Sequence, residues 1–298
     1  MATYVNAASV AEAVEALAAG ARPVAGGTDL VVGSRQGKKP LPESLVGIHR
    51  IDELHEVSDG SDGLRLGALV THAAIVSHPS IRKRYTGLAD ASAIVGSHAT
   101  RANGTIGGNV MNASPAMDTG APLLCMGTTV ELRGPAGTRR VALDQLWTGP
   151  GGTVASPDEL LVAVEIPIPA LGSGSAYVRL QYRRQMEIAV VGAAALVTVA
   201  GGVITDARIA ITALAPVIHR IPEAESLLVG HRPDADGSVA AAAEAVAEAT
   251  RPISDVRATA DYRRAMAAVI ARRAIQAALT RATGGAVAIP ASESTYGS

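Results

Sequence analysis

The amino-acid sequence predicts an α+β fold. Two long helical patterns lie close together near the C-terminus, at residues 239–249 and 256–279. The segments typical of strands, with alternating or continuous apolar residues, lie mainly in separate stretches before them. Because strands and helices are segregated along the chain, a regular series of strand–helix–strand units is not expected.

The composition is that of a globular protein with a large aliphatic core. A chain of 298 residues can form two domains or one large domain. Aromatic residues make up only 2% of it, with no Phe, so Val, Leu, Ile and Ala must fill the core. The 31 glycines favour close packing of backbone segments.

Several classes of function are disfavoured by the composition. The net charge of −1 does not indicate a nucleic-acid or anionic-membrane partner. The single cysteine, Cys125, cannot form an internal disulfide or hold an iron–sulfur cluster, and the seven histidines lack metal-binding spacing. The longest apolar run, residues 188–200, is shorter than the ~20 residues that span a bilayer, and no signal peptide is apparent. We therefore expect a cytoplasmic protein without membrane insertion, with Cys125 in its core.

The first half of the chain predicts short elements separated by glycine-containing loops. Ser9 and Glu12 form a capping-box pattern that begins a helix, and Gly20 ends it. A short strand over residues 22–25 then runs into the pair Gly26-Gly27. Further along, we expect a half-buried strand over 64–68, a short buried helix over 89–97 and another strand over 129–133.

A change of composition near residues 167–175, where Pro, Gly and Ser are frequent, predicts a domain boundary. The predicted domains are residues 1–170 and 175–285, followed by a disordered tail over 286–298. Trp147 is expected to pack at the junction between the subdomains of the first domain.

The second domain is expected to contain a hairpin followed by helices. Strands over 177–182 and 188–199 lead into Gly201-Gly202, a favourable hairpin turn, and apolar residues alternate on the return. In the last helix, over 256–279, one face is predicted to carry the apolar contacts and to exclude most arginines. The apolar residues of that face are Tyr262, Met266, Val269 and Ile270, and the arginines largely off it are Arg263, Arg264, Arg272 and Arg273.

Two glycine pairs, in AGGTDL (25–30) and TIGGN (105–109), raise the possibility of a ligand site. Successive backbone N–H groups with little side-chain obstruction can form a concave nest for an anion, and each hydrogen bond to a charged group contributes about 1.5–3 kcal/mol. Two such loops could converge on a diphosphate. Either pair taken alone is more typical of a plain turn or bulge. Neither loop has the GxGxxG or P-loop pattern, so the residues alone suggest a phosphate-bearing ligand without naming it.

Longer stretches around these loops resemble a known family. They are PVAGGTDLVV (23–32), LGALVTHAAI (66–75), NGTIGGNVMNASPAMDTGAPLL (103–124) and RRQMEIAVVGAA (183–194), and TALAPVIHR (212–220) and residues 254–275 continue the likeness. Together they resemble the FAD-binding medium subunits of the molybdenum hydroxylases, which include xanthine dehydrogenase-type and carbon monoxide dehydrogenase-type enzymes. The resemblance implies a two-subdomain FAD-binding fold of the vanillyl-alcohol oxidase-like type, followed by a small α/β C-terminal domain.

The resemblance also implies where FAD would lie. Both glycine loops would hold its diphosphate, and Asn112 and Asp118 would contact the ribityl and ribose part. Leu161 and Val95 would lie near the flavin, and Arg179 stands where some members carry a lysine near the ring. The implied cofactor-binding residues are Pro23, Val24, Ala25, Gly26, Gly27, Thr28, Asp29, Val95, Thr105, Ile106, Gly107, Gly108, Asn109, Asn112, Asp118, Leu161 and Arg179.

Alternative roles remain open for some of these residues. Asp118 could instead cap a helix after Pro115, and Arg179 could instead form a surface salt bridge. Val95 is smaller than the residue that many members of the family carry. The family likeness would also place a β turn at residues 188–191 beside the ring, with no aromatic side chain to stack on it.

The function implied by the resemblance is that of an electron-transfer subunit. Electrons would pass from a molybdopterin cofactor in a large subunit, through two [2Fe–2S] clusters in a small subunit, to FAD in this chain and then to an external acceptor. The assembly would be a dimer of heterotrimers, and this chain would need no catalytic residue because the redox chemistry belongs to the cofactor. A free-standing FAD-dependent oxidoreductase and a non-catalytic nucleotide-binding module are the alternatives.

Overall fold

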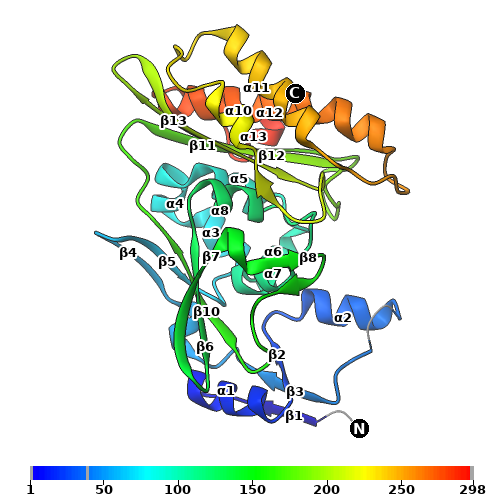
Figure 1. The fold of residues 1–298 in the computed structure, drawn as a ribbon. Helices are drawn as coiled ribbons and strands as arrows, with labels where there is room; N and C mark the ends of the chain where they lie inside the picture. The colour runs from blue at the N-terminus through cyan, green and yellow to red at the C-terminus, as the bar shows by residue number, and fades with distance from the viewer. Residues whose placement is uncertain (1–2, 38–39, 296–298) are drawn as a thin grey trace.

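The structure is a computed structural model that describes residues 3–37 and 40–295. Three main sheets follow one another from the N-terminal end of the molecule to the C-terminal end, from bottom to top in Figure 1. Helices lie between the second and third sheets and on the far side of the third. The α+β class predicted from the sequence is confirmed.

The first sheet is small and parallel, with strand order β1-β3-β2. Its strands and helices are β1 (Thr3–Asn6), α1 (Val10–Ala18), β2 (Arg22–Val24), α2 (Thr28–Arg35) and β3 (Ser44–Gly47). The predicted start of α1 is confirmed, because the Ser9 hydroxyl accepts a hydrogen bond from the Glu12 N–H at 3.2 Å. The Glu12 carboxylate in turn accepts from the N–H of Ala8 at 2.9 Å. These two bonds satisfy N–H groups that the helix itself leaves unpaired.

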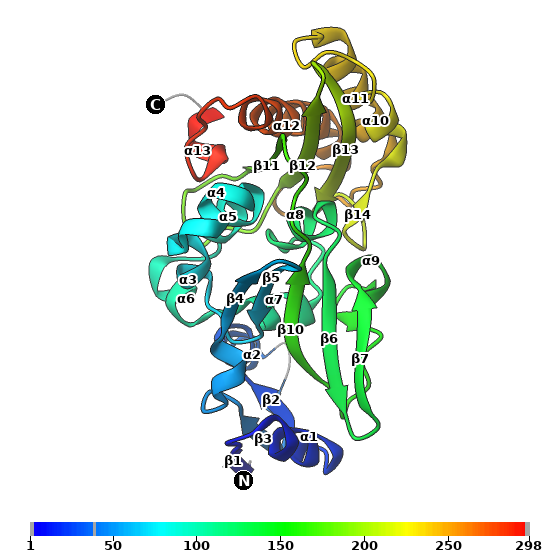
Figure 2. The same cartoon turned by 90° about the vertical axis from the view of Figure 1, so that its left-hand side faces the viewer.

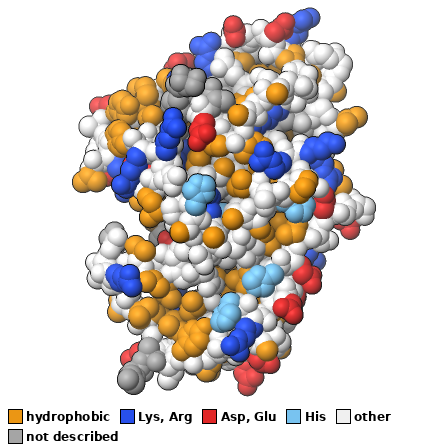
Figure 3. All heavy atoms as spheres, turned by 180° about the vertical axis from the view of Figure 1, so that it is seen from behind, with side chains coloured by type: hydrophobic (Ala, Val, Ile, Leu, Met, Phe, Trp, Pro, Cys, Tyr) orange, Lys and Arg blue, Asp and Glu red, His pale blue; other side chains and the backbone are white. Residues whose placement is uncertain are grey.

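The N-terminal lobe exposes apolar side chains. None of the residues of α2 is buried, and Val31 and Val32 on this helix are exposed, as are Tyr4 and Val5 on β1. Figure 3, seen from behind, shows apolar atoms gathered over this part of the molecule.

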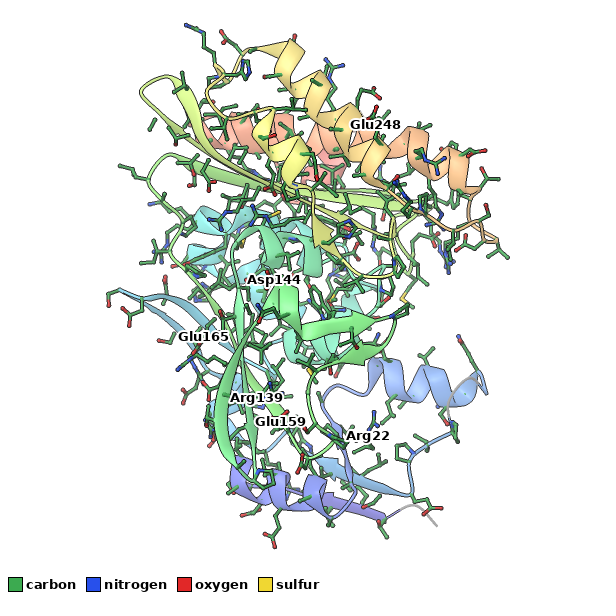
Figure 4. The ribbon with its side chains drawn as sticks, viewed as in Figure 1. Arg22, Arg139, Asp144, Glu159, Glu165 and Glu248 are labelled. Atoms are coloured by element: carbon green, nitrogen blue, oxygen red, sulfur yellow. The ribbon has the colours of Figure 1, made fainter. Side chains whose placement is uncertain are left out.

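The second sheet is antiparallel, with strand order β4-β5-β10-β6-β7. Its strands are β4 (Val57–Gly60), β5 (Gly63–Gly67), β6 (Thr129–Gly134), β7 (Gly137–Ala142) and β10 (Leu160–Ile166). Ion pairs cross its strands, including Arg139–Glu159 at 2.7 Å and Arg140–Glu165 at 2.8 Å. Figure 4 shows Arg139 and Glu159 side by side at the lower end of this sheet.

Most of the helices of the first half lie in the connection between β5 and β6. They are α3 (His72–Ser77), α4 (Pro79–Arg84), α5 (Thr86–Ala93), α6 (His98–Asn103), α7 (Ile106–Asn112) and α8 (Gly120–Cys125). The buried helix expected at 89–97 is thus observed earlier, as α5. Shorter elements are the 3-10 helix η1 (Asp52–His55), α9 (Leu143–Leu146), and the strand pair β8 (Trp147–Gly149) and β9 (Gly152–Thr153).

The third sheet is antiparallel, with strand order β11-β12-β13-β14. Its elements, with the helices that follow, are β11 (Ser173–Leu180), β12 (Val191–Ala200), β13 (Val203–Thr212), β14 (His219–Arg220), α10 (Pro222–Ser226), α11 (Asp236–Ala249), α12 (Ala260–Ala282) and α13 (Ala291–Thr295). The hairpin at Gly201-Gly202 is confirmed, because both residues have positive φ, 59° and 81°, which glycine adopts without strain. The chain enters this sheet through residues 167–172, and the predicted domain ranges 1–170 and 175–285 stay a prediction.

The predicted packing face of α12 is only partly confirmed, by the burial of Ile270. Tyr262 and Val269 are 42% and 37% exposed, whereas Arg263 is only 3% exposed. The guanidinium of Arg263 is buried because it donates to the carbonyl oxygens of Val190 and Ala213 and pairs with a carboxylate, that of Asp255 at 2.8 Å. The rest of the buried face is mainly alanine, so that α12 packs closely on the sheet.

Two other expectations about the C-terminal half are wrong. The tail expected to be disordered contains α13, in which Ala291 and Ser292 are buried, and only residues 296–298 of it lie outside the described residues. The turn expected at 188–191 is absent, because residues 182–186 form the bend and Val191 already begins β12. No helix among the described residues has the length and apolar character needed to cross a membrane.

Candidate functional site

The two glycine loops lie against each other. A Cβ atom added to Gly26 would overlap the carbonyl oxygen of Asn103, just before the second loop. A Cβ atom added to Gly104 would lie 3.7 Å from the hydroxyl oxygen of Thr28. The loop that begins α2 and the loop that begins α7 therefore form one junction, although about eighty residues separate them in the sequence.

The first loop offers backbone donors. Gly27 has a left-handed φ of 68° and precedes the first residue of α2, with no side chain capping the helix. Within residues 3–37 and 40–295, the N–H groups of Gly26, Gly27 and Thr28 have no hydrogen-bond acceptor. Unpaired N–H groups at the start of a helix, together with the positive end of its dipole, favour an anion. The donors predicted for this loop are present.

The second loop is different, because its N–H groups already have acceptors. The expectation that it forms a second nest of free donors is therefore wrong. Two of these N–H groups hold the start of α7 against the segment before α3, in which Thr71 forms an antiparallel bridge with Thr105, and the other two bond within the loop to Thr105. The bonds run from Ile106 to the Val70 oxygen, from Gly107 to the Ala68 oxygen, from Gly108 to Thr105 Oγ1 and from Asn109 to the Thr105 oxygen, at 2.9–3.1 Å.

The glycines of the second loop have a packing role. Gly107 is buried, and a Cβ atom there would lie 2.7 Å from the carbonyl oxygen of Ala68. Gly108 is exposed, and so is Asn112 one helical turn later. Residues four apart lie on the same face of a helix. Gly108 and Asn112 therefore form an exposed strip on α7.

Asn109 is held beside this strip. Its side-chain oxygen accepts a hydrogen bond of 2.6 Å from the hydroxyl of Thr119. This bond fixes the amide group, so its NH₂ end faces away from Thr119.

His72 belongs to the junction, although no sequence pattern indicated it. The backbone N–H of His72 donates to the carbonyl oxygen of Gly104. The ring carbon Cδ2 of His72 would lie 3.5 Å from a Cβ atom added to Gly104. The imidazole is 1% exposed and its Nδ1 has no hydrogen-bond partner among the described residues. Burial, with a smaller effect from the charge of Arg101, lowers the pKa of His72 to about 4. The ring is therefore neutral near pH 7.

Asp118 and Arg179 form a buried ion pair. The Nη1 of Arg179 lies 2.7 Å from the Oδ2 of Asp118, and the hydroxyl of Tyr177 donates to Oδ1 at 2.9 Å. Arg179 has no exposed surface, so the surface salt bridge considered for it is wrong. Asp118 does not cap a helix either, because α8 begins after Thr119 without a side-chain cap. Burial raises the pKa of Asp118 and the charge of Arg179 opposes this rise.

All five N–H groups of the Arg179 guanidinium point at protein acceptors. Besides Asp118, these are the side-chain oxygen of Gln181 and the carbonyl oxygens of Ile94 and Glu187. Val95, half-buried beside Ile94, has its own carbonyl oxygen bonded by Arg101 at 3.0 Å. The cation therefore joins β11 to the segment that follows α5, and its charge is balanced by Asp118.

Of the other sequence-predicted residues, one lies in the second sheet and the rest flank the first glycine loop. Leu161 is a buried residue of β10, paired with Leu132 of β6, next to an irregularity in the strand. Pro23 and Val24 end β2, and Ala25 is half-buried before the first glycine pair. Asp29 is exposed in the first turn of α2.

Trp147 and Cys125 have structural positions. The indole N–H of Trp147 donates to the carbonyl oxygen of Val110 in α7 at 3.0 Å, so Trp147 supports this helix. Cys125 is buried, which raises the pKa of its thiol to about 12, as expected for a core residue and not for a nucleophile.

Comparison with known proteins places this arrangement among flavoproteins. Residues 1–169 match the family described as FAD binding domain in molybdopterin dehydrogenase, and residues 176–278 match the CO dehydrogenase flavoprotein C-terminal domain. The chain is 35% identical over 280 residues to the carbon monoxide dehydrogenase medium chain of Afipia carboxidovorans, with 92% of this chain and 95% of that one covered. It is 29% identical over 287 residues to the putative xanthine dehydrogenase FAD-binding subunit of Escherichia coli, with 95% and 98% covered.

A solved structure is similar throughout. It is that of the carbon monoxide dehydrogenase from Hydrogenophaga pseudoflava which lacks the Mo-pyranopterin moiety of the molybdenum cofactor. The TM-score is 0.90 at 32% identity, over 94% of this chain and 98% of that chain.

Proposed function

This chain belongs to the family of FAD-binding medium subunits of the molybdenum hydroxylases, and we propose that it holds FAD by its diphosphate at the junction of the two glycine loops. It is the flavoprotein subunit of a molybdenum-containing oxidoreductase. When bound, FAD supplies the electron-transfer chemistry between iron–sulfur clusters of a partner subunit and an external acceptor. The residues of this chain bind and orient the cofactor.

The observation that supports this position most directly is the asymmetry of the junction. The first loop has three backbone N–H groups without acceptors at the start of α2, which suits a diphosphate. The second loop supplies close approach instead, because Gly108 is exposed and has no side chain, whereas Gly107 packs against Ala68. The neutral ring of His72 lies beside the same junction, so it adds a polar group without a charge.

From this junction, the remainder of the cofactor would follow the exposed face of α7. Asn112 would then meet the sugar hydroxyls, as the family likeness suggests, and Val95 and Arg179 would lie towards the ring. Because every N–H group of Arg179 has a protein acceptor, we expect it to act on the ring through its charge and not through a direct hydrogen bond. Asp118 balances that charge, so the effect on the ring depends on how the ion pair is oriented.

The partners are a large and a small subunit, since the relatives are medium subunits of multi-subunit enzymes. We propose that the large subunit carries the molybdopterin cofactor and the small one the two [2Fe–2S] clusters, in a dimer of heterotrimers. The described residues supply no group of His, Cys, Asp or Glu that could hold a metal ion.

Gly26→Ala tests the position of the cofactor. The added methyl group would overlap the backbone oxygen of Asn103, just before the second loop, so it should separate the loops and lower FAD affinity. Gly33→Ala is the matched control in α2, because no atom lies within 4 Å of the added methyl group. FAD affinity is measured by titrating the apoprotein. Equal affinity for both folded variants would contradict the proposed site.

A further inference from the structure

β11 is an edge strand whose outer edge is covered by other parts of the chain. It pairs only with β12 within its sheet. On its free edge, the N–H of Tyr177 donates to the Asp90 carboxylate at 3.1 Å, and the N–H of Arg179 donates to the Ser292 hydroxyl at 3.0 Å. Unpaired N–H groups of a buried edge destabilise a fold, so these two acceptors are required.

The same two residues hold Asp118 with their side chains. Tyr177 and Arg179 are two positions apart in a strand, so their side chains leave the same face. Both reach the carboxylate of Asp118, one on each oxygen. The backbone position of two residues on β11 therefore fixes the geometry around Asp118.

Asp90 connects β11 with the C-terminal end of the chain. This fully buried carboxylate accepts from the N–H groups of Tyr177 and Ala291 and forms an ion pair with Arg281 at 2.6 Å. Arg281 also donates to the carbonyl oxygens of Val287 and Ala288. Figure 2 shows α13, in red, beside α5 and β11.

We propose that residues 287–292, here called the C-terminal clasp, position the Asp118–Arg179 pair beside the flavin. In the clasp, the hydroxyl of Ser292 accepts a hydrogen bond from the backbone N–H of Arg179. The backbone N–H of Ala291 donates to the Asp90 carboxylate, which also accepts from the N–H of Tyr177. The clasp lies beyond residue 278, where the matched C-terminal domain ends. Ser292 is a positioning residue, because it acts through Arg179. This inference rests on the proposed FAD site.

Ser292→Ala is the decisive variant, with Ser226→Ala as the control, because the hydroxyl of Ser226 bonds only to an exposed turn of α10. In Ser292→Ala, the absorbance spectrum and midpoint potential of the bound flavin should shift. Its FAD dissociation constant should stay within about twofold of the wild type, because the glycine junction lies apart from the clasp. A purely structural role would lower stability without moving the spectrum or the potential. Unchanged values of both would overturn the proposal.

Amide hydrogen exchange gives a second readout that does not need FAD. Loss of the Ser292 acceptor should accelerate exchange of the Arg179 amide by about tenfold. Exchange at the wild-type rate would refute the clasp even in apoprotein. If the wild-type chain takes up no FAD while Arg179 exchange still accelerates, the proposed cofactor site fails and the contact between clasp and strand stands.

Discussion

Arg179→Met should strongly destabilise the folded chain. The substitution keeps a long apolar stem but removes the cation from a position with no exposed surface. Asp118 then retains only the hydroxyl of Tyr177, and the carbonyl oxygens of Ile94 and Glu187 lose a donor. Removing one partner of a buried ion pair costs about 3–5 kcal/mol. We expect a loss of this size in the free energy of unfolding.

A double-mutant cycle isolates the pair. Asp118→Asn keeps an oxygen that can accept from Arg179, so it should cost less, about 1.5–3 kcal/mol. In the Asp118→Asn background, Arg179→Met should cost less than in the wild type, with a coupling of about 1–3 kcal/mol. Urea unfolding of the apoprotein, followed by circular dichroism, measures all four proteins.

A control pair lies on the surface. Arg232 and Asp234 form a two-point contact, with side chains 75% and 71% exposed. Arg232→Met should not change the stability measurably. A loss of stability in Arg179→Met as small as that in Arg232→Met, or additive effects of Arg179→Met and Asp118→Asn, would refute a coupled buried ion pair.

Three further predictions concern single residues. The pKa of His72 lies near 4, below the 6.5 of a free histidine, so the stability from its neutral burial is complete above pH 6.5 and is lost as the pH falls towards 4. His72→Gln should remove this part of the acid destabilisation, about 3 kcal/mol in the free energy of unfolding measured at both pH values. An unchanged pH profile would contradict this prediction. Cys125 should react with a thiol reagent only on unfolding; modification in the native protein at the rate of a free thiol would show that it is accessible. Gly202→Ala, at φ 81°, should lower the free energy of unfolding by about 1–2 kcal/mol. Gly60→Ala, in open space without a positive φ, should leave it nearly unchanged. Equal effects of the two variants on thermal unfolding would contradict the turn assignment.

Local features of this fold could be predicted from the sequence. The cap at Ser9 and the turn at Gly201-Gly202 depend on residues within a few positions of each other. The two glycine loops could be selected because glycine pairs beside apolar runs are conspicuous. No sequence pattern connected these loops with the segment 68–72. Their contact, and the bonding of the second loop's N–H groups while those of the first stay free, depend on that segment.

Contacts between distant residues could not be predicted. Arg179 meets Asp118 across 61 positions, and Ala291 meets Asp90 across 201. An arginine on a helix is normally placed on the solvent side, so the burial of Arg263 by carbonyl oxygens of two other segments was missed. The tail was expected to be disordered, whereas two specific hydrogen bonds hold it.

Calorimetric titration of the apoprotein with FAD, ADP and FMN tests the central claim most directly. If the chain holds FAD by its diphosphate at the glycine junction, it should bind one FAD per chain, ADP should compete for that site, and FMN, which lacks the diphosphate, should bind far more weakly. FMN binding as tight as FAD, or FAD binding that ADP does not displace, would contradict the account.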